Sequence, residues 1–558
     1  MRFMQKSMRK FKIIIAILLL LAIGSSAALA DALDEALSLF SDWDEEDTQS
    51  ENTETVEVDP GAELVYTGSS VLNTVADLRV GCVVDEGAQL NPFVCTEQDY
   101  LNIQPLVFES VVELNDELKP VPLLADSWTL EDTTWTFKLR SGIQFHNGAM
   151  LTAEDVYQSY QQYLLAGETN PWYARLSLIK EMRVIDDTTL EVEATGTGLM
   201  TLYAMTFPVV QRDTVNDMMP RGTGPYWITE FVRGTGFRLE RNPLWWKNDP
   251  EIQSVVCIRY EDTGAALTAL ATGEINLLST RSNTAALTRQ TSNVVSLDYA
   301  TTTYEMLVPN LDESSVMSDV NMRKAVMYAI DRATLVSNAY LGMGVQCEVP
   351  VNPSSWLYES QSAVYYYSPE RALQLIQQLG WEDLTGDGMM NKQDGVRLYD
   401  LELKLYTYNE PTNQIRENAA NLIRLNLEKI GITVNVYVVS KARCLQRIKD
   451  HTADIALIGV NLSEIPMLNS LFESKGDLNL NNGGSEAMKT ELEKAYNASD
   501  EDTLIQAMSA IQLLVTERLP VLGLLWRSGT VLATRSLSGL SGLRSGNSLN
   551  GIEFMSLQ

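Results

Sequence analysis

The chain has 558 residues, of which 73 are acidic and 42 basic, so its formal net charge at pH 7 is −31. Such a negative chain is expected to avoid nucleic acid and anionic membrane surfaces, and its length exceeds what one hydrophobic core usually holds. We therefore expect two or three lobes and no nucleic-acid partner. Its five cysteines form no C-x-x-C pair, which argues against a zinc ribbon or redox motif and allows at most two disulfides.

The first 30 residues resemble a secretory signal. Basic residues precede an apolar run at 13–23, which is too short to span a bilayer. Ala28-Leu29-Ala30 is a cleavage site of the A-x-A type. We predict a signal peptide over 1–30 and an exported protein, periplasmic or extracellular. No cysteine directly follows the apolar run, so no lipoprotein anchor is expected.

Residues 31–76 are predicted to be an acidic, disordered leader. Asp and Glu dominate positions 31–60, which hold no basic residue, and much of the rest is Ser, Thr and Asn. Such a segment buries too little apolar surface to offset the entropy of ordering. A partner-binding segment is the alternative interpretation.

The stretch WTFKLRSGIQFHNGAMLTAEDV (135–156) predicts strand, turn, strand, turn and a capped helix. Apolar and polar residues alternate over 135–140, as in a half-buried strand. Thr152 and Asp155 have the spacing of a capping box at a helix N-terminus. His146, one of only two histidines, lies beside the second turn. Because no nucleophile or orienting carboxylate is evident nearby, we predict a structural rather than a catalytic histidine.

After about residue 302 the pattern becomes alternating strand and helix. Residues 318–336 and 369–379 are expected to be helical, the second with Ser368 as N-cap and Gly380 after its end. Strands are expected at 401–408, 432–439 and 453–460, with helices at 412–430 and 440–450 between them. These β-α-β units predict a largely parallel sheet.

Ligands of open α/β sheets bind beyond the carboxyl ends of strands. Two such ends carry polar residues and are candidate sites: Tyr408-Asn409-Glu410 and the run from Val460 through Asn461 and Ser463 to Glu464. Ordinary loop polarity is the alternative explanation for each of these residues.

The segment DLTGDGMMNKQD (383–394) resembles a calcium-binding loop. Gly388 stands at its sixth position, where an EF-hand loop turns sharply. No exiting helix is evident, because VRLYDLELKLY reads as strand. A structural Ca²⁺ and an acidic turn without metal both remain open, and no cofactor is required. The candidate ligands are Asp383, Thr385, Asp387, Asn391 and Asp394, with the carbonyl of Met389.

Several stretches together resemble the family 5 extracytoplasmic solute-binding proteins, which are the oligopeptide-, dipeptide- and nickel-binding components of ABC importers. The match follows the family's order from about residue 78 to 557. The stretches that carry it are the 135–156 segment, LVFESVVELND, RGTGPYWITEFVRGTGFRLERNPLWW, VNMRKAVMYAIDRATLV and ERLPVLGLLW.

The resemblance implies an α/β, two-lobed fold of the periplasmic-binding-protein type II (Venus flytrap) with an additional strand-rich insertion domain. Ligand would bind between the lobes, which close by hinge motion. The 135–156 segment would then belong to the insertion domain. The expected boundaries are 77–107, 206–301 and 516–558 for lobe I, 108–205 for the insertion domain, and 302–515 for lobe II.

The implied function is capture of a small peptide or related solute for an ABC permease, by a monomer without enzymatic activity. Peptide-binding members commonly hold the peptide's amino group with an Asp that falls near Ser463 here, and the neighbouring Glu464 could supply the carboxylate. The family often has Trp where Val460 stands. These departures leave a nickel chelate, another non-peptide solute, or a secreted calcium-binding sensor or enzyme as alternatives. Thr96 and Tyr304 complete the candidate ligand-binding set.

Overall fold

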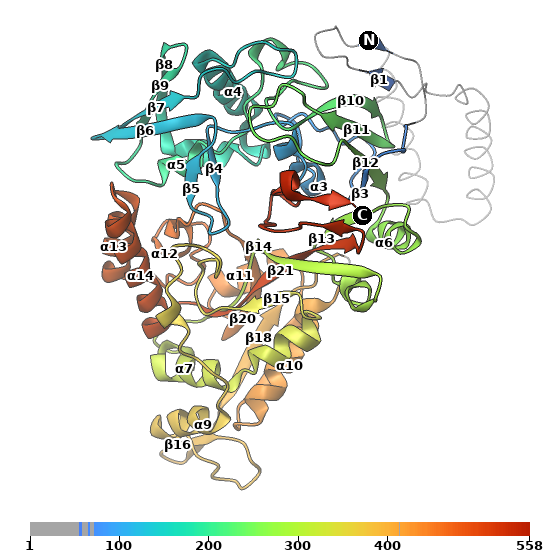
Figure 1. Ribbon diagram of the computed structural model, residues 1–558. Helices are drawn as coiled ribbons and strands as arrows, with labels where there is room; N and C mark the ends of the chain where they lie inside the picture. Colours follow the sequence, from blue (N-terminus) through green and yellow to red (C-terminus); the bar gives the residue numbers. More distant parts are fainter. Residues whose placement is uncertain (1–54, 58–64, 67–71, 412, 558) are drawn as a thin grey trace, which may run out of the picture. The chain divides into compact units, whose positions relative to one another are not determined.

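A computed structural model describes residues 55–57, 65–66, 72–411 and 413–557. The predicted signal peptide and most of the predicted leader lie outside the described residues. Figure 1 shows the arrangement of the elements.

The largest sheet passes through most of the described chain. Two long antiparallel strands, β14 (Val294–Pro309) and β21 (Leu522–Thr534), lie side by side at its centre. Among the described residues, 13 strands join this sheet, and β15 (Gly344–Gln346) pairs with β21. The order of the others is β19 (Thr433–Val438), β18 (Glu402–Thr407), β20 (Ile455–Asn461), β14, β21, β13 (Leu277–Thr280), β3 (Leu78–Val83), β12 (Ser254–Tyr260), β11 (Gly236–Arg241), β10 (Tyr226–Val232), β1 (Thr55–Glu57) and β2 (Val65–Tyr66).

On one side of the central pair, strands and helices alternate as predicted. β18 is parallel to both β19 and β20, and α10 (Ile415–Glu428) and α11 (Lys441–Lys449) connect them. The prediction of parallel β-α-β units is therefore confirmed. β14 joins β20 antiparallel, so the parallel arrangement ends at the central pair.

The helix predicted over 318–336 is interrupted. It forms α7 (Val320–Ala329) and α8 (Arg332–Thr334), because Ile330 is extended and the Asp331 side chain accepts a hydrogen bond from the backbone N–H of Thr334. This capping bond starts a new helix. Ser368 caps α9 (Pro369–Gln378), as predicted.

A separate four-stranded antiparallel sheet lies within 108–205. Its order is β6 (Ala125–Glu131), β7 (Thr134–Leu139), β9 (Thr189–Ala194) and β8 (Ile179–Asp186). α4 (Ala153–Ala166) begins with the predicted capping box, in which Asp155 accepts a hydrogen bond from the Thr152 backbone at 3.0 Å. Two short strands, β4 (Val112–Leu114) and β5 (Pro120–Pro122), pair nearby.

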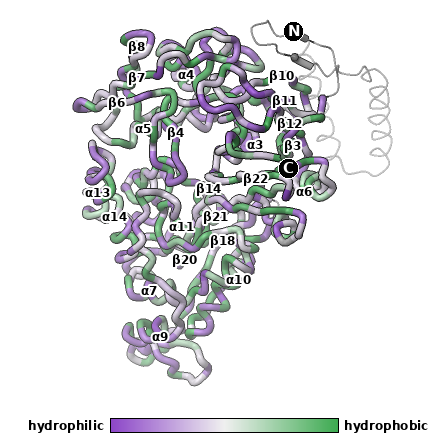
Figure 2. The backbone as a smooth tube through the Cα atoms, viewed as in Figure 1, coloured by the Kyte–Doolittle hydropathy of each residue, from purple (hydrophilic) through white to green (hydrophobic). Residues whose placement is uncertain are grey.

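The remaining α-helices of four or more residues in the described chain are α3 (Gln98–Leu101), α5 (Thr201–Ala204), α6 (Thr263–Thr272), α12 (Asn469–Phe472), α13 (Glu486–Tyr496) and α14 (Glu501–Arg518). In Figure 2, hydrophilic and hydrophobic residues mix along the strands, and α13 carries many hydrophilic residues. β12, which reads SVVCIRY, is buried over its first five residues, as expected for a strand covered on both faces. Within the described part of the chain, no helix is long and apolar enough to cross a membrane.

The cysteines form no cross-links. All five are free thiols and all are buried: Cys82, Cys95, Cys257, Cys347 and Cys444. Burial in the core suits the small thiol side chain, and the Cys347 thiol also donates to the Val349 carbonyl at 3.1 Å.

Candidate functional site

The two central strands change register where they face the candidate site. Ala300 of β14 pairs with Ser528 of β21, but the next pair joins Tyr304 to Trp526. β14 therefore carries extra residues at this point, a bulge that bends the strand. The Thr301 hydroxyl donates to the Arg527 carbonyl at 2.8 Å and holds the bulge against β21.

A cavity of about 260 Å³ opens beside this bulge. Its wall comes from segments far apart in the sequence, which the central strands bring together. The lining includes residues 298–302 of β14, 350–355 of the loop after β15, Ser463 and Glu464 after β20, Trp526 and Ser528 of β21, and residues 543–545 near the C-terminus. The segment that follows the carboxyl end of β20 thus contributes to this cavity, and its role in ligand binding stays a prediction.

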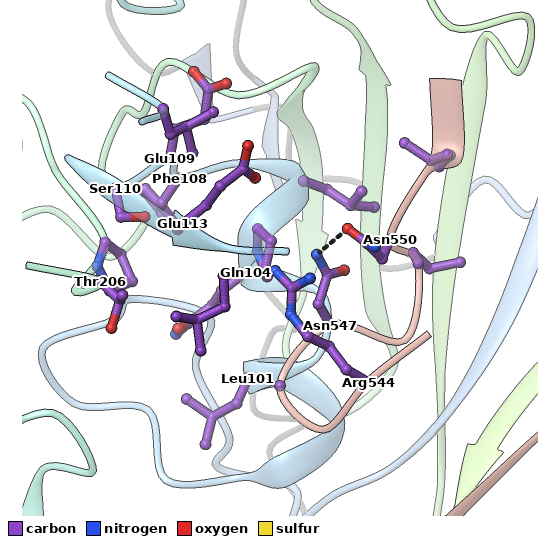
Figure 3. A pocket seen from close by; sticks show the side chains of 18 of the residues that line it. Leu101, Gln104, Phe108, Glu109, Ser110, Glu113, Thr206, Arg544, Asn547 and Asn550 are labelled. Carbon is purple, nitrogen blue, oxygen red and sulfur yellow. Dashed lines mark hydrogen bonds between the residues drawn. The ribbon is translucent and has the colours of Figure 1, made fainter. Parts of the chain in front are cut away.

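Figure 3 shows a second cavity, of about 150 Å³. Both cavities share Glu464, Arg544 and Ser545, which therefore mark their junction. Residues 104–114 and the C-terminal segment supply most of the second wall. Burial raises the pKa of the Glu113 carboxyl in this wall, although Lys247 and Arg544 oppose the shift.

Glu464 is already engaged by a cation. Its Oε2 accepts a hydrogen bond from Arg175 Nη2 at 2.8 Å, and both side chains are largely buried. Arg175 also donates to the Thr206 hydroxyl at 3.0 Å and lies over the Trp172 ring at 4.6 Å. A ligand ammonium group at Glu464 would therefore share the carboxylate with Arg175.

Arg544 differs from Arg175. Its side chain extends from the C-terminal turn into the second cavity beside Gln104 and Asn547 (Figure 3). The guanidinium makes no hydrogen bond or ion pair with any residue that the structure describes. Burial lowers its pKa, against the opposing effect of Glu464, Glu113 and Asp116. An arginine keeps its proton even so, hence this wall holds a poorly solvated positive charge.

Apart from Ser463 and Glu464, the predicted ligand-binding residues lie outside both cavities. Tyr304 is fully buried against Trp526, and Val460 is buried opposite it in the β14–β20 pairing. Asn461 accepts a hydrogen bond from Thr303, at the exposed edge of that pairing. Thr96 is exposed and lines neither cavity.

The candidates after β18 are occupied by local contacts. The Tyr408 hydroxyl donates to the Gly459 carbonyl at 3.2 Å, and the Asn409 amide donates to Glu417 at 2.7 Å. These bonds tie the end of β18 to β20 and α10. Of the eight candidates, Ser463 and Glu464 are the ones that line either of these two cavities.

Close to these residues lies a buried cluster of four paired charges. Arg416 donates to both oxygens of Glu305, at 2.9 and 3.0 Å. Arg416 and Arg527 also reach the same oxygen of Glu410, at 3.0 and 2.9 Å. This arrangement links β14, α10 and β21 and leaves none of the four groups unpaired.

The predicted calcium loop is held by its own hydrogen bonds. Asp383 accepts from the backbone N–H groups of Gly386 and Gly388, at 2.7 and 2.9 Å, and Asp387 accepts from Met389 at 2.9 Å. Thr385 donates to the Asn391 side chain at 3.4 Å. The chain continues into a hairpin of β16 (Asn391–Asp394) and β17 (Arg397–Asp400), not into a helix.

The loop does not gather its carboxylates. The structure does not bring Asp383, Asp387 and Asp394 together as a group able to hold a metal ion. The acidic turn and the structural Ca²⁺ both stay predictions, which the Asp383→Ala variant distinguishes.

His146 is placed as the sequence predicts. It is buried, its Nδ1 accepts a hydrogen bond from the Gly222 backbone N–H, and its Nε2 donates to the Gly224 carbonyl, both at 3.3 Å. Burial lowers its pKa to about 3. The neutral ring joins the 135–156 segment to residues 222–224 and lines neither cavity.

The 108–205 segment also contacts the expected lobe II away from the cavities. The Thr197 hydroxyl donates to the Asn497 carbonyl at 2.7 Å, and the Leu199 N–H donates to the Ala498 carbonyl at 2.8 Å. Gly198 lies so close that a Cβ there would stand 2.0 Å from a backbone oxygen of α13. Only glycine permits this approach.

Sequence reasoning missed Arg544, Arg175, Asp116 and the loop at 350–355. One signal was available: Arg544 is the only basic residue between Arg535 and the C-terminus, within a Gly- and Ser-rich stretch. The other residues carry no local pattern, because only the fold brings them to one cavity.

Comparison with known proteins places this geometry in a family. The model of the bacterial extracellular solute-binding proteins, family 5 middle region, matches residues 119–481. The oligopeptide-binding protein AppA of Bacillus subtilis (strain 168) is 24% identical over 422 residues, covering 71% of this chain and 76% of AppA. The dipeptide-binding protein of Escherichia coli (strain K12) is 22% identical over 374 residues, covering 61% of this chain and 67% of that protein.

A solved structure supports the fold. The crystal structure of a nickel ABC transporter protein from Bacillus halodurans superposes with a TM-score of 0.72 at 20% identity, over 86% of this chain and 98% of that one. The predicted two-lobed periplasmic-binding-protein fold is thereby confirmed.

Proposed function

Because the chain belongs to the bacterial extracellular solute-binding proteins of family 5, we propose that it captures a small peptide outside the cytoplasm and delivers it to an ABC permease. It works as a monomer, performs no catalysis and requires no cofactor. The names of AppA and of the dipeptide-binding protein support a peptide as the solute.

One observation carries this proposal: the cavity of about 260 Å³ where β14 and β21 bulge. These two strands contribute to both halves of the large sheet, so a change in the bulge would move the halves together or apart. A solute between them stabilises the closed arrangement by contacting both walls. The volume lies just below the roughly 300–1,000 Å³ usual for ligand pockets, which favours a short peptide over a long one.

Ser463 and Glu464 contribute polar groups to the wall of this cavity. Glu464 offers one carboxylate oxygen to Arg175 at 2.8 Å, and its second oxygen is available for a peptide's ammonium group. A charge-assisted hydrogen bond of this kind contributes about 1.5–3 kcal/mol. Val351 and Trp526 supply apolar surface for side chains.

Native mass spectrometry of the exported, gently purified protein tests the proposal. We expect adducts that denaturation releases as short peptides, and fewer of them from Glu464→Gln. A single non-peptide adduct, such as a nickel chelate, would keep the binding role and refute the peptide assignment. Unchanged uptake of labelled peptides in a deletion strain would refute the import role.

A further inference from the structure

We infer that Arg544 binds an anionic group of the captured solute, a carboxylate, and so fixes which end of the solute reaches the junction of the two cavities. This inference rests on the proposed solute-binding function and adds the charge of the ligand to it. Arg544 belongs to the walls of both cavities, so a solute in the larger one can reach it.

The other cations around the two cavities already have partners. Arg175 pairs with Glu464 at 2.8 Å, Lys247 lies 3.9 Å from Glu113, and Arg281 donates to the Ser545 hydroxyl at 2.8 Å. The Arg544 guanidinium has no such partner among the described residues. A guanidinium carries five N–H donors, and a partly desolvated charge without a partner is costly. A carboxylate from the solute would satisfy it in a bidentate arrangement.

The backbone holds Arg544 ready for this contact. Arg544 and Asn547 exchange two backbone hydrogen bonds, at 3.1 and 3.2 Å, which close a tight turn. The Gly546 N–H donates to the Asn102 side chain at 3.0 Å and ties that turn to α3. The Asn550 amide donates to the Gly542 carbonyl at 2.8 Å across the base of the turn. A binding residue on a fixed backbone loses little entropy when the ligand arrives.

The neighbouring carboxylates narrow the class of solute. Glu464 and Asp116 line the larger cavity together with Arg544, and both carboxylates act electrostatically on its guanidinium. A purely anionic solute would face both of them, whereas a zwitterion places its ammonium group near them and its carboxylate at Arg544. The pattern of charge therefore selects a zwitterionic solute, such as a peptide with free termini.

Paired peptide pools provide the test. One pool contains mixed-sequence tripeptides as free acids, and the other contains the same tripeptides as C-terminal amides. Titration calorimetry compares wild type, Arg544→Gln and Arg544→Lys with the matched control Arg424→Gln, which removes a positive charge from α10 outside the cavities. Thermal melting checks that each variant is folded.

We expect wild type and Arg424→Gln to bind the acids about 10- to 100-fold more tightly than the amides, as loss of a charge-assisted hydrogen bond predicts. Arg544→Gln should lose that preference while its affinity for the amides stays unchanged, and Arg544→Lys should keep part of it. Within the amidated pool, tripeptides that contain Asp or Glu could still bind wild type more tightly than those that do not. If Arg544→Gln loses this difference in affinity, the carboxylate that Arg544 binds belongs to a side chain of the peptide.

The inference is overturned if Arg544→Gln discriminates acids from amides as wild type does. If wild type binds neither pool, the peptide assignment fails separately. In that case the role of Arg544 is tested with the solute that co-purifies with the protein. Loss of that solute in Arg544→Gln supports the inference, and equal retention by wild type and Arg544→Gln overturns it.

Discussion

The buried cluster of Glu305, Arg416, Glu410 and Arg527 and the cavity wall around Arg544 both hold charge away from water, but they differ in pairing. In the cluster every charged group has an oppositely charged partner at 2.9–3.0 Å. On the cavity wall Arg544 has none among the described residues. Paired buried charges fix the relative positions of strands and helices, whereas an unpaired charge beside a cavity is available to a ligand. Substitutions in the cluster should therefore lower the stability of the fold, whereas substitution of Arg544 should change ligand binding.

The largest effect is expected inside the cluster. Glu305→Gln removes the bidentate partner of the buried Arg416, which then keeps only its contact with Glu410 at 3.0 Å, so the free energy of unfolding should fall by about 3 kcal/mol, the low end of the cost of breaking a buried pair. Chemical denaturation measures this change. The double variant Glu305→Leu/Arg416→Met should lose less than Glu305→Gln, because it leaves no unpaired charge in that pair. A loss below about 1 kcal/mol in Glu305→Gln would contradict the assigned structural role.

A smaller loss is expected at Gly198. Alanine there would place its Cβ 2.0 Å from a backbone oxygen of α13, and such overpacking costs about 1–3 kcal/mol. Thermal melting should show destabilisation. Gly87→Ala is the matched control, because no atom lies within 4 Å of a Cβ at that position. Equal stability of the two variants would show that the contact between 195–199 and α13 is not maintained in solution.

Because His146 is buried and neutral, we expect the stability of the protein to depend on pH. Its pKa is about 3 in the folded protein, against 6.5 for a histidine exposed to water, so between these values the unfolded state binds the additional proton. The contribution of His146 to the free energy of unfolding is complete above pH 6.5. It falls by about 1.4 kcal/mol per pH unit as the pH drops toward 3. His146→Gln should flatten the plot of unfolding free energy against pH over this acidic range. Parallel plots for the two proteins would contradict a neutral, buried histidine.

The smallest effect is expected in the acidic turn. Asp383→Ala removes two hydrogen bonds to backbone N–H groups, and the unfolding free energy should fall by about 1 kcal/mol. The fall should be equal with calcium and with a chelator. Calcium that stabilises wild type but not Asp383→Ala would instead establish the metal-binding interpretation.

Sequence patterns predicted the elements that are stabilised by interactions between residues close together in the sequence. The 135–156 segment, the cap at Ser368 and the parallel strands after residue 400 depend on spacing that can be read from short stretches of sequence. The break at Ile330 was missed because Asp331 competes as a helix cap within an otherwise helical pattern. The exit from the acidic turn was read correctly as strand.

The site was less accessible to sequence reasoning. Strand ends led to Ser463 and Glu464, which do line a cavity, but the same argument selected Tyr408 and Asn409, whose polar atoms are bound to neighbouring elements. Tyr304 was assigned to the ligand and is instead packed against Trp526. Arg544 reaches the cavity only because the C-terminal segment returns to the β14–β21 bulge, and no local pattern encodes that return.

The most direct test of the central claim is a crystal structure of the protein with the solute that it retains through purification. We predict electron density for a small peptide in the cavity beside the β14–β21 bulge, with a carboxylate against the Arg544 guanidinium. Density for a solute elsewhere on the protein, or a solute in this cavity that leaves Arg544 without an anionic partner, would contradict the account.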